Sequence, residues 1–84
     1  MNDTMFYVYV LRCSDGTLYT GYTDDIRKRL KLHHDGKASK YTRSRLPVKL
    51  VTHWTFSSKS DAMRYEVLFK HLSRTTKMEQ LAAK

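Results

Sequence analysis

The sequence has little cysteine and no long hydrophobic run. Cys13 is the only cysteine among the 84 residues, so the chain can form neither an internal disulfide nor a zinc site built from cysteines. The longest apolar run, residues 5–11, is far shorter than the roughly 20 residues of a membrane-spanning helix. No signal-peptide pattern precedes it. We therefore expect a cytoplasmic protein.

Acidic residues are also scarce. Asp and Glu together number 8, against 16 Lys and Arg, which leaves a formal net charge of +8 at pH 7. A positive excess favours binding to polyanions, because binding releases the counterions condensed on them. The charge therefore favours a nucleic-acid partner over a charge that serves solubility alone.

Internal repeats, low-complexity tracts and linkers are absent from the sequence. A chain of this length supports one compact core, and its 40% hydrophobic and 12% aromatic residues are typical of a folded domain. We expect residues 1–84 to form a single domain, without a second module for recognition.

Two strands joined by a tight turn are predicted near the N-terminus. Phe6–Arg12 (FYVYVLR) is rich in β-branched and aromatic residues, and residues 17–23 (TLYTGYT) form the returning strand. Residues 14–16 (SDG) supply the turn. A three-residue turn places Tyr9 and Tyr19 on one face of the sheet, whereas a two-residue turn would place them on opposite faces.

A helix follows this hairpin. Thr23 or Asp24 can cap its N-terminus and Gly36 can end it, so we expect it over residues 24–35. The stripe that borders the core consists of Ile26, Leu30 and His33.

The rest of the chain adds a strand and two more helices. Residues 37–47 read as a polar, basic connection and residues 48–56 (VKLVTHWTF) as a third strand. Capping motifs open a helix over residues 58–72 and a short one from residue 76. The order β-β-α-β-α-α predicts an α+β fold, in which helices flank a three-stranded, mainly antiparallel sheet.

Four residues have the chemistry that phosphodiester hydrolysis needs: Tyr9, Tyr19, Arg29 and Glu66. The reaction requires a water nucleophile, a group that takes its proton, positive charge for the transition state and usually a metal ion. Guanidinium binds phosphate in a bidentate way, and a carboxylate with phosphate oxygens is a usual way to hold Mg²⁺. His33, one turn after Arg29, could donate to a phosphate or relay a proton.

Each of these residues also has a purely structural interpretation. Glu66 borders a core-facing helix stripe, where a carboxylate either pairs with a buried base or holds an ion. Arg29 can be a solvated surface residue and His33 a helix histidine with satisfied hydrogen bonds. The two tyrosines can be core aromatics, since a phenol with a pKa of about 10 needs neighbouring positive charge to act as a base.

Their joint pattern resembles the GIY-YIG nuclease superfamily. A Tyr-Val-Tyr triplet ends at Tyr9, a Tyr-Thr-Gly triplet starts ten residues later at Tyr19, Arg29 follows ten further, and Glu66 lies in a predicted helix. The first triplet lacks its usual glycine, and the second has threonine in place of an apolar residue. The resemblance covers about residues 6–81 and is greatest to small stand-alone bacterial members.

The resemblance implies an endonuclease that uses one divalent ion, Mg²⁺ or Mn²⁺. Nucleic acid is the implied substrate, with DNA expected and specific structures in repair or recombination as targets. Tyr9 or Tyr19 would activate the attacking water, and Arg29 and His33 would assist catalysis. Glu66 would be the metal ligand.

The resemblance also implies how nucleic acid is held. Gly21 matches the closing glycine of the second triplet, where a side chain would crowd the site. A basic segment typical of the stand-alone members would clamp the backbone. The residues expected to contact nucleic acid are Arg27, Lys28, Lys40, Thr42, Arg43 and Arg45. A protein partner could supply specificity to so small a domain.

Two other functions are compatible with the sequence. One is a non-catalytic nucleic-acid-binding module on the same fold, and the other is a small structural protein whose charge serves solubility. A binding module has no use for a lone carboxylate that faces phosphates, because the two would repel. Glu66, together with both tyrosines and Arg29, therefore favours the nuclease.

Overall fold

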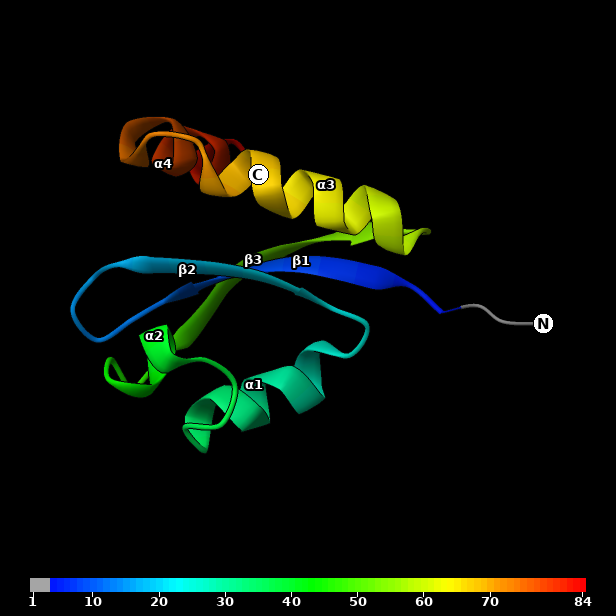
Figure 1. Cartoon of the computed structure of the whole chain (residues 1–84). Coiled ribbons are helices and arrows are strands. Elements are labelled where there is room, and N and C mark those ends of the chain that lie inside the picture. The colour runs from blue at the N-terminus through cyan, green and yellow to red at the C-terminus, as the bar shows by residue number, and fades with distance from the viewer. Residues whose placement is uncertain (1–3) are drawn as a thin grey trace.

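A three-stranded antiparallel sheet forms the centre of the fold (Figure 1). β1 (Phe6–Arg12) is the middle strand, and β2 (Leu18–Thr23) and β3 (Lys49–Phe56) pair with its two sides. The computed structural model describes residues 4–84. Both the predicted fold class and the predicted antiparallel sheet are confirmed.

Helices cover both faces of this sheet. α1 (Ile26–His34) and the short α2 (Lys40–Arg43) lie on one face, and α3 (Lys59–Lys70) and α4 (Arg74–Ala83) lie on the other (Figure 1). The order of strands and long helices is the predicted one. None of the helices in the described part of the chain is long and apolar enough to cross a membrane.

The hairpin has the three-residue turn that places the two tyrosines on one face. Leu11 lies opposite Tyr19, and the Cys13 amide donates to the Thr17 carbonyl at 2.8 Å. Gly16 has a φ of +82°, a left-handed conformation that side chains disfavour. The alternative two-residue turn is therefore wrong.

The helix boundaries depart from the sequence prediction at their N-termini. Asp25 caps α1 by accepting from the Lys28 amide at 3.0 Å. Neither of the two predicted caps, Thr23 or Asp24, has that role, and Thr23 instead accepts from the Asp25 amide. α4 starts after a cap at Ser73 rather than at residue 76. In each case a nearby oxygen satisfies the free amides of the first turn.

The core has two halves, one on each side of the sheet. On the α1 face, Tyr9 and Leu11 of β1 are buried beneath the helix and pack with Val48. On the α3 face, the rings of Trp54 and Phe69 lie 5.3 Å apart between centroids. Strand residues alternate between these halves, so each face of β1 is tied to its own helical layer.

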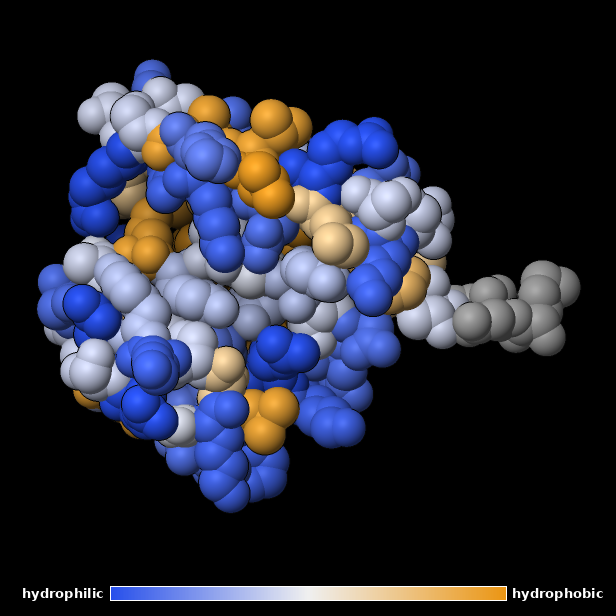
Figure 2. Space-filling model, viewed as in Figure 1, coloured by the Kyte–Doolittle hydropathy of each residue, from blue (hydrophilic) through white to orange (hydrophobic). Residues whose placement is uncertain are grey.

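Hydrophilic residues dominate the outside of both layers. Figure 2 shows strongly hydrophilic side chains above and below the sheet, while hydrophobic ones gather mainly over α3 and α4. Met63, Val67 and Leu68 of α3 are the exposed apolar residues of that layer. On the face shown, hydrophilic surface therefore predominates and the apolar patches are small.

Candidate active site

Tyr9 is the central residue of the site, and its ring lies over Gly21, which has no side chain. Tyr9 lies on β1 opposite Gly21 of β2 and is only 1% exposed. A Cβ atom added to Gly21 would lie 2.6 Å from Tyr9 Oη, a distance that real carbon atoms do not approach. The glycine therefore lets the tyrosine ring extend over β2 and bring its hydroxyl toward the edge of the sheet.

A buried chain of hydrogen bonds holds this hydroxyl. Tyr9 Oη lies 2.9 Å from Nε2 of His33 on α1, and His33 Nδ1 lies 2.8 Å from Oγ1 of Thr42 on α2. The three residues are each 1% exposed or less. The chain connects the central strand to both helices of this layer.

Burial keeps this tyrosine and this histidine neutral. It raises the pKa of Tyr9 above its ordinary value, an effect to which the negative charges of Tyr19 and Glu66 add, while the charge of Arg29 and a hydrogen bond from it oppose the rise. Burial also lowers the pKa of His33 to about 4, assisted by the positive charges of Arg29 and His34. At neutral pH, Tyr9 therefore keeps its proton and His33 carries one proton rather than two.

Tyr19 lies beside this pair on the same face. Its ring centroid is 6.4 Å from that of Tyr9 and 5.2 Å from that of His33. On its other side Tyr41 of α2 stacks at 6.1 Å. Tyr19 is only partly buried, so its ring can contact a bound molecule. Most of the surface of Tyr9 is covered by the protein and cannot.

Arg29 and Glu66 approach from opposite layers. Arg29 belongs to α1, and Glu66 belongs to α3 on the far face of the sheet. Both act electrostatically on the Tyr9 hydroxyl. The structure thus brings the five residues Tyr9, Tyr19, Arg29, His33 and Glu66 to one region around β2.

The partner of Glu66 is not a buried base. Its carboxylate forms an ion pair of 3.2 Å with Lys70, one turn along α3, and the two side chains are 14% and 46% exposed. The Lys70 ammonium also lies 5.9 Å from the ring centroid of Tyr19. The carboxylate is thus paired and largely shielded, but its partner is a half-exposed lysine rather than the buried base of the structural alternative.

Two hollows lie along this edge of the sheet. One, of about 330 Å³, contains Arg29 of α1 together with Lys59 of α3. The other, of about 270 Å³, is lined by residues of β2, α2, α3 and α4, among them Tyr19, Tyr41, Lys70 and Lys77. Each hollow thus joins side chains from both helical layers, and basic residues outnumber acidic ones in both, with Asp24 the one acidic residue of the first.

The residues expected to bind nucleic acid do not all share one surface. Lys28, Lys40 and Arg43 are exposed and can bind a phosphate backbone. Arg27 points to a separate hollow of about 490 Å³ between α1 and β3. The expectation for Thr42 is wrong, because its side chain is buried behind His33 and 1% exposed.

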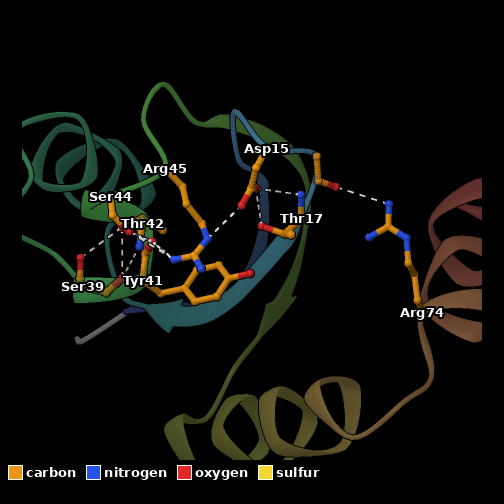
Figure 3. Close-up of polar contacts among 9 residues, drawn as sticks. Asp15, Thr17, Ser39, Tyr41, Thr42, Ser44, Arg45 and Arg74 are labelled. Carbon is orange, nitrogen blue, oxygen red and sulfur yellow. Dashed lines mark hydrogen bonds and ion pairs between the residues drawn. The ribbon is translucent and has the colours of Figure 1, made fainter.

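Arg45 has a structural role that the sequence did not reveal. Its Nε donates to the Asp15 carboxylate at 2.9 Å, and its guanidinium lies 3.8 Å from the Tyr41 ring centroid (Figure 3). Arg74 of α4 reaches the same turn, donating to the Gly16 carbonyl at 3.3 Å. These contacts fix the hairpin turn and Tyr41, so Arg45 is less free to bind phosphate than the exposed lysines.

Sequence reasoning missed three residues that border the site: Tyr41 of α2, Lys70 of α3 and Lys77 of α4. Lys70 had one usable signal, since it follows Glu66 by one helical turn. Tyr41 and Lys77 had none, because they reach the site only through packing between distant segments. Ser39, which caps α2, could have been identified from its position before the basic segment.

Glu66 fits the role of a ligand for a hard divalent cation. Among residues 4–84, no three His, Cys, Asp or Glu side chains come together as a metal-binding group. Mg²⁺ often uses only one or two carboxylates and completes its coordination with water and substrate phosphates. A single, partly exposed carboxylate beside basic residues is the donor set that such a shared site needs.

Comparison with known proteins identifies the family. The family model described as "GIY-YIG catalytic domain" matches residues 5–79. The chain therefore belongs to the GIY-YIG family, a nuclease superfamily, as the triplets, Arg29 and Glu66 predicted.

Similar proteins of known sequence and structure carry the designation UPF0213. A UPF0213 protein of Streptococcus agalactiae is 60% identical over 72 residues, which cover 86% of this chain and 82% of the relative. The solution NMR structure of the UPF0213 protein from Bacillus halodurans superposes with a TM-score of 0.65 at 51% identity, covering 95% of this chain and 85% of that one. A protein from E. faecalis, also solved by NMR, gives a TM-score of 0.67 at 38% identity, with 98% and 88% covered.

Proposed function

We propose that this protein is a metal-dependent endonuclease that hydrolyses phosphodiester bonds of nucleic acid, with DNA as the expected substrate. The observation that carries the proposal is that Tyr9, His33 and Tyr19 pack together. Glu66 reaches the same place through its ion pair with Lys70, whose ammonium lies 5.9 Å from the Tyr19 ring centroid, and the charge of Arg29 acts on Tyr9. A cation, a carboxylate and a phenol in one place are the groups that hydrolysis of a phosphodiester needs.

The two tyrosines have different roles in this proposal. Tyr9 keeps its proton and is fixed by His33, so its oxygen orients the attacking water rather than removing a proton from it. Tyr19 is more open to solvent and has the Lys70 ammonium 5.9 Å from its ring centroid. Because it can contact both solvent and a bound molecule, Tyr19 is our candidate for the group that takes the proton of the water.

Positive charge stabilises the transition state from two sources. Arg29 can bind two phosphate oxygens with its guanidinium and stays charged at any relevant pH. Glu66, with phosphate and water oxygens, would hold one Mg²⁺ or Mn²⁺, and that ion supplies Lewis-acid stabilisation of the developing charge. Lys28, Lys40 and Arg43, which are exposed, would bind the neighbouring backbone.

The experiment that tests the proposal is a cleavage assay with Mg²⁺, with Mn²⁺ and with EDTA. The substrates are nicked, flapped, branched, duplex and single-stranded DNA, with RNA of matching sequence. We expect cleavage of at least one DNA substrate that EDTA abolishes. Binding without cleavage under every condition would instead support the non-catalytic module, and neither binding nor cleavage would support a structural protein.

A further inference from the structure

The strongest unexplained feature is the buried hydroxyl chain behind His33. Thr42 Oγ1 lies 2.8 Å from His33 Nδ1 and 3.0 Å from Ser39 Oγ, and it also donates to the Ser39 carbonyl at 3.4 Å. Ser39 itself is held by the Thr42 amide, which donates to Ser39 Oγ at 3.1 Å. Figure 3 shows Ser39 and Thr42 joined at the start of α2.

Each hydroxyl and the neutral imidazole of this hydrogen-bonded row has one proton to donate. Counting these protons shows which group donates and which accepts in each bond. The Thr42 hydroxyl has one proton, and both of its contacts with Ser39 can accept it. If that proton points to Ser39, the Thr42 oxygen accepts from a proton on His33 Nδ1. Nε2 is then bare and accepts the hydroxyl proton of Tyr9, so every donor in the chain has an acceptor.

The opposite direction leaves a donor without a partner. If Thr42 donated to Nδ1, the His33 proton would lie on Nε2 and point at the Tyr9 oxygen, where Arg29 also donates. The Tyr9 hydroxyl proton would then have no acceptor in this row of hydrogen bonds and would point into the space left for the attacking water, in a residue that is 1% exposed. An unpaired buried donor is costly, so the first direction, in which His33 Nε2 accepts the Tyr9 proton, is favoured.

We propose that Thr42 and Ser39 are positioning residues for the nuclease site. Their hydroxyl chain fixes the His33 tautomer with its proton on Nδ1, which directs the Tyr9 proton to Nε2 and leaves the Tyr9 lone pairs for Arg29 and the attacking water. The tautomer of a histidine is set by the bond that its other nitrogen makes. The catalytic part of this inference rests on the proposed function, whereas the tautomer does not.

The arrangement also gives α2 two connected functions. Lys40 and Arg43 are exposed on this four-residue helix, whereas Thr42 between them is buried on His33. The same short segment would therefore bind the nucleic-acid backbone on its outer side and orient the site on its inner side.

The test reads the tautomer directly, by ¹⁵N NMR of the histidine side chains of the full chain at pH 7. Loss of one signal set in His33→Gln assigns His33. We expect the proton of the parent His33 on Nδ1, and a shift toward Nε2 in Thr42→Val, in which the acceptor is gone. Cleavage by Thr42→Val should fall about 10–100-fold, the usual effect of losing such a supporting contact, and Thr42→Ser should restore both readouts.

Controls separate positioning from stability. Thr52→Val makes the same chemical change on β3, away from the chain of hydrogen bonds, and should change neither readout. If Thr42→Val does not fold, Ser39→Ala keeps Thr42 but removes one of its two acceptors, and a partial shift toward Nε2 is expected. A parent His33 with its proton on Nε2, or a tautomer that stays on Nδ1 in a folded Thr42→Val, overturns the inference. A parent that has the expected tautomer but cuts no substrate overturns the proposed function and leaves the tautomer assignment standing.

Discussion

Tyr9 and Gly21 face each other across β1 and β2, and the Tyr9 hydroxyl occupies the space that a side chain at residue 21 would need. Tyr9 Oη and Cζ lie 2.6 and 2.8 Å from the place of a Cβ on that glycine. The position of the Tyr9 ring therefore requires a residue without a side chain at position 21. This contact explains the glycine of the second triplet.

Gly21→Ala should therefore damage both the fold and the site. Overpacking of this kind costs about 1–3 kcal/mol of unfolding free energy, and moving the Tyr9 hydroxyl by about 1 Å could lower activity about 10²-fold. Urea denaturation and cleavage assays measure the two effects. In a Tyr9→Phe background the nearest atom is gone, so the alanine should cost less there. An equal cost in both backgrounds would show that the contact with Tyr9 is not the cause.

Glu66→Gln should abolish cleavage without unfolding the protein. Losing the metal ligand should reduce the rate at least ~10³-fold, while nucleic-acid binding stays intact or becomes slightly tighter. The ion pair with Lys70 is partly exposed, so the unfolding free energy should change by only about 0.5 kcal/mol. Glu79→Gln, on exposed α4, is the matched control. A Glu66→Gln protein that cuts at the parental rate removes Glu66 from the mechanism.

Tyr19→Phe tests the assignment of the proton acceptor. Loss of a general base typically lowers the rate about 10²–10⁴-fold, and we expect a fall of this size in a cleavage assay. Tyr22→Phe, on the same strand but the opposite sheet face, should behave like the parent. If Tyr19→Phe keeps the parental rate, another group accepts the proton.

Binding to nucleic acid should depend strongly on salt and weakly on sequence. With four to six phosphate contacts, a plot of log K against log[salt] for duplex DNA should have a slope of roughly −4 to −5. Lys40→Ala and Arg43→Ala should each reduce its magnitude by about one. Lys49→Ala, on β3 at the far edge of the sheet, should leave the slope unchanged. A slope near zero for the parent would mean that the basic surface does not bind phosphate.

Acid should destabilise the fold through His33. Burial lowers the pKa of His33 from 6.5 to about 4. Between these two pH values His33 is protonated in the unfolded chain and neutral in the folded one. Stability should therefore fall as the pH drops through this window, by at most about 1.4 kcal/mol per pH unit. Melts of His33→Gln should lack this dependence, and those of His53→Gln, which changes an exposed histidine, should retain it. Parallel pH curves for the parent and His33→Gln would contradict the shift.

The hairpin and its register were predictable because short-range rules determine them. Residue alternation assigns each strand residue to a face, and Gly16 supplies the left-handed residue that a three-residue turn requires. Once that turn is set, Tyr9 and Tyr19 must share a face. The α+β order followed from the same local periodicities.

The place of Thr42 could not be predicted in this way. α2 has four residues, too few for any helical periodicity to show which side is inward. Thr42 is buried because α2 packs against α1 and brings its hydroxyl to His33, nine positions earlier in the chain. Similarly, the choice of Asp25 over Thr23 as the cap of α1 depends on a competing hydrogen bond between those two residues. Tertiary packing thus determines the burial of Thr42, and competition between nearby hydrogen bonds determines the cap of α1. The sequence pattern specifies neither.

The burial of Tyr9 and His33 bears on how a lineage of such proteins would lose its activity. Both side chains are part of the core, so a mutation that removes either one impairs folding along with chemistry and is selected against even where cleavage no longer matters. Glu66 forms its ion pair with a half-exposed lysine outside the core, so its loss costs the fold less once catalysis is dispensable. When relatives are compared, conservation of the tyrosine–histidine pair thus indicates only that the fold is shared. Conservation of the glutamate indicates that the chemistry is still under selection.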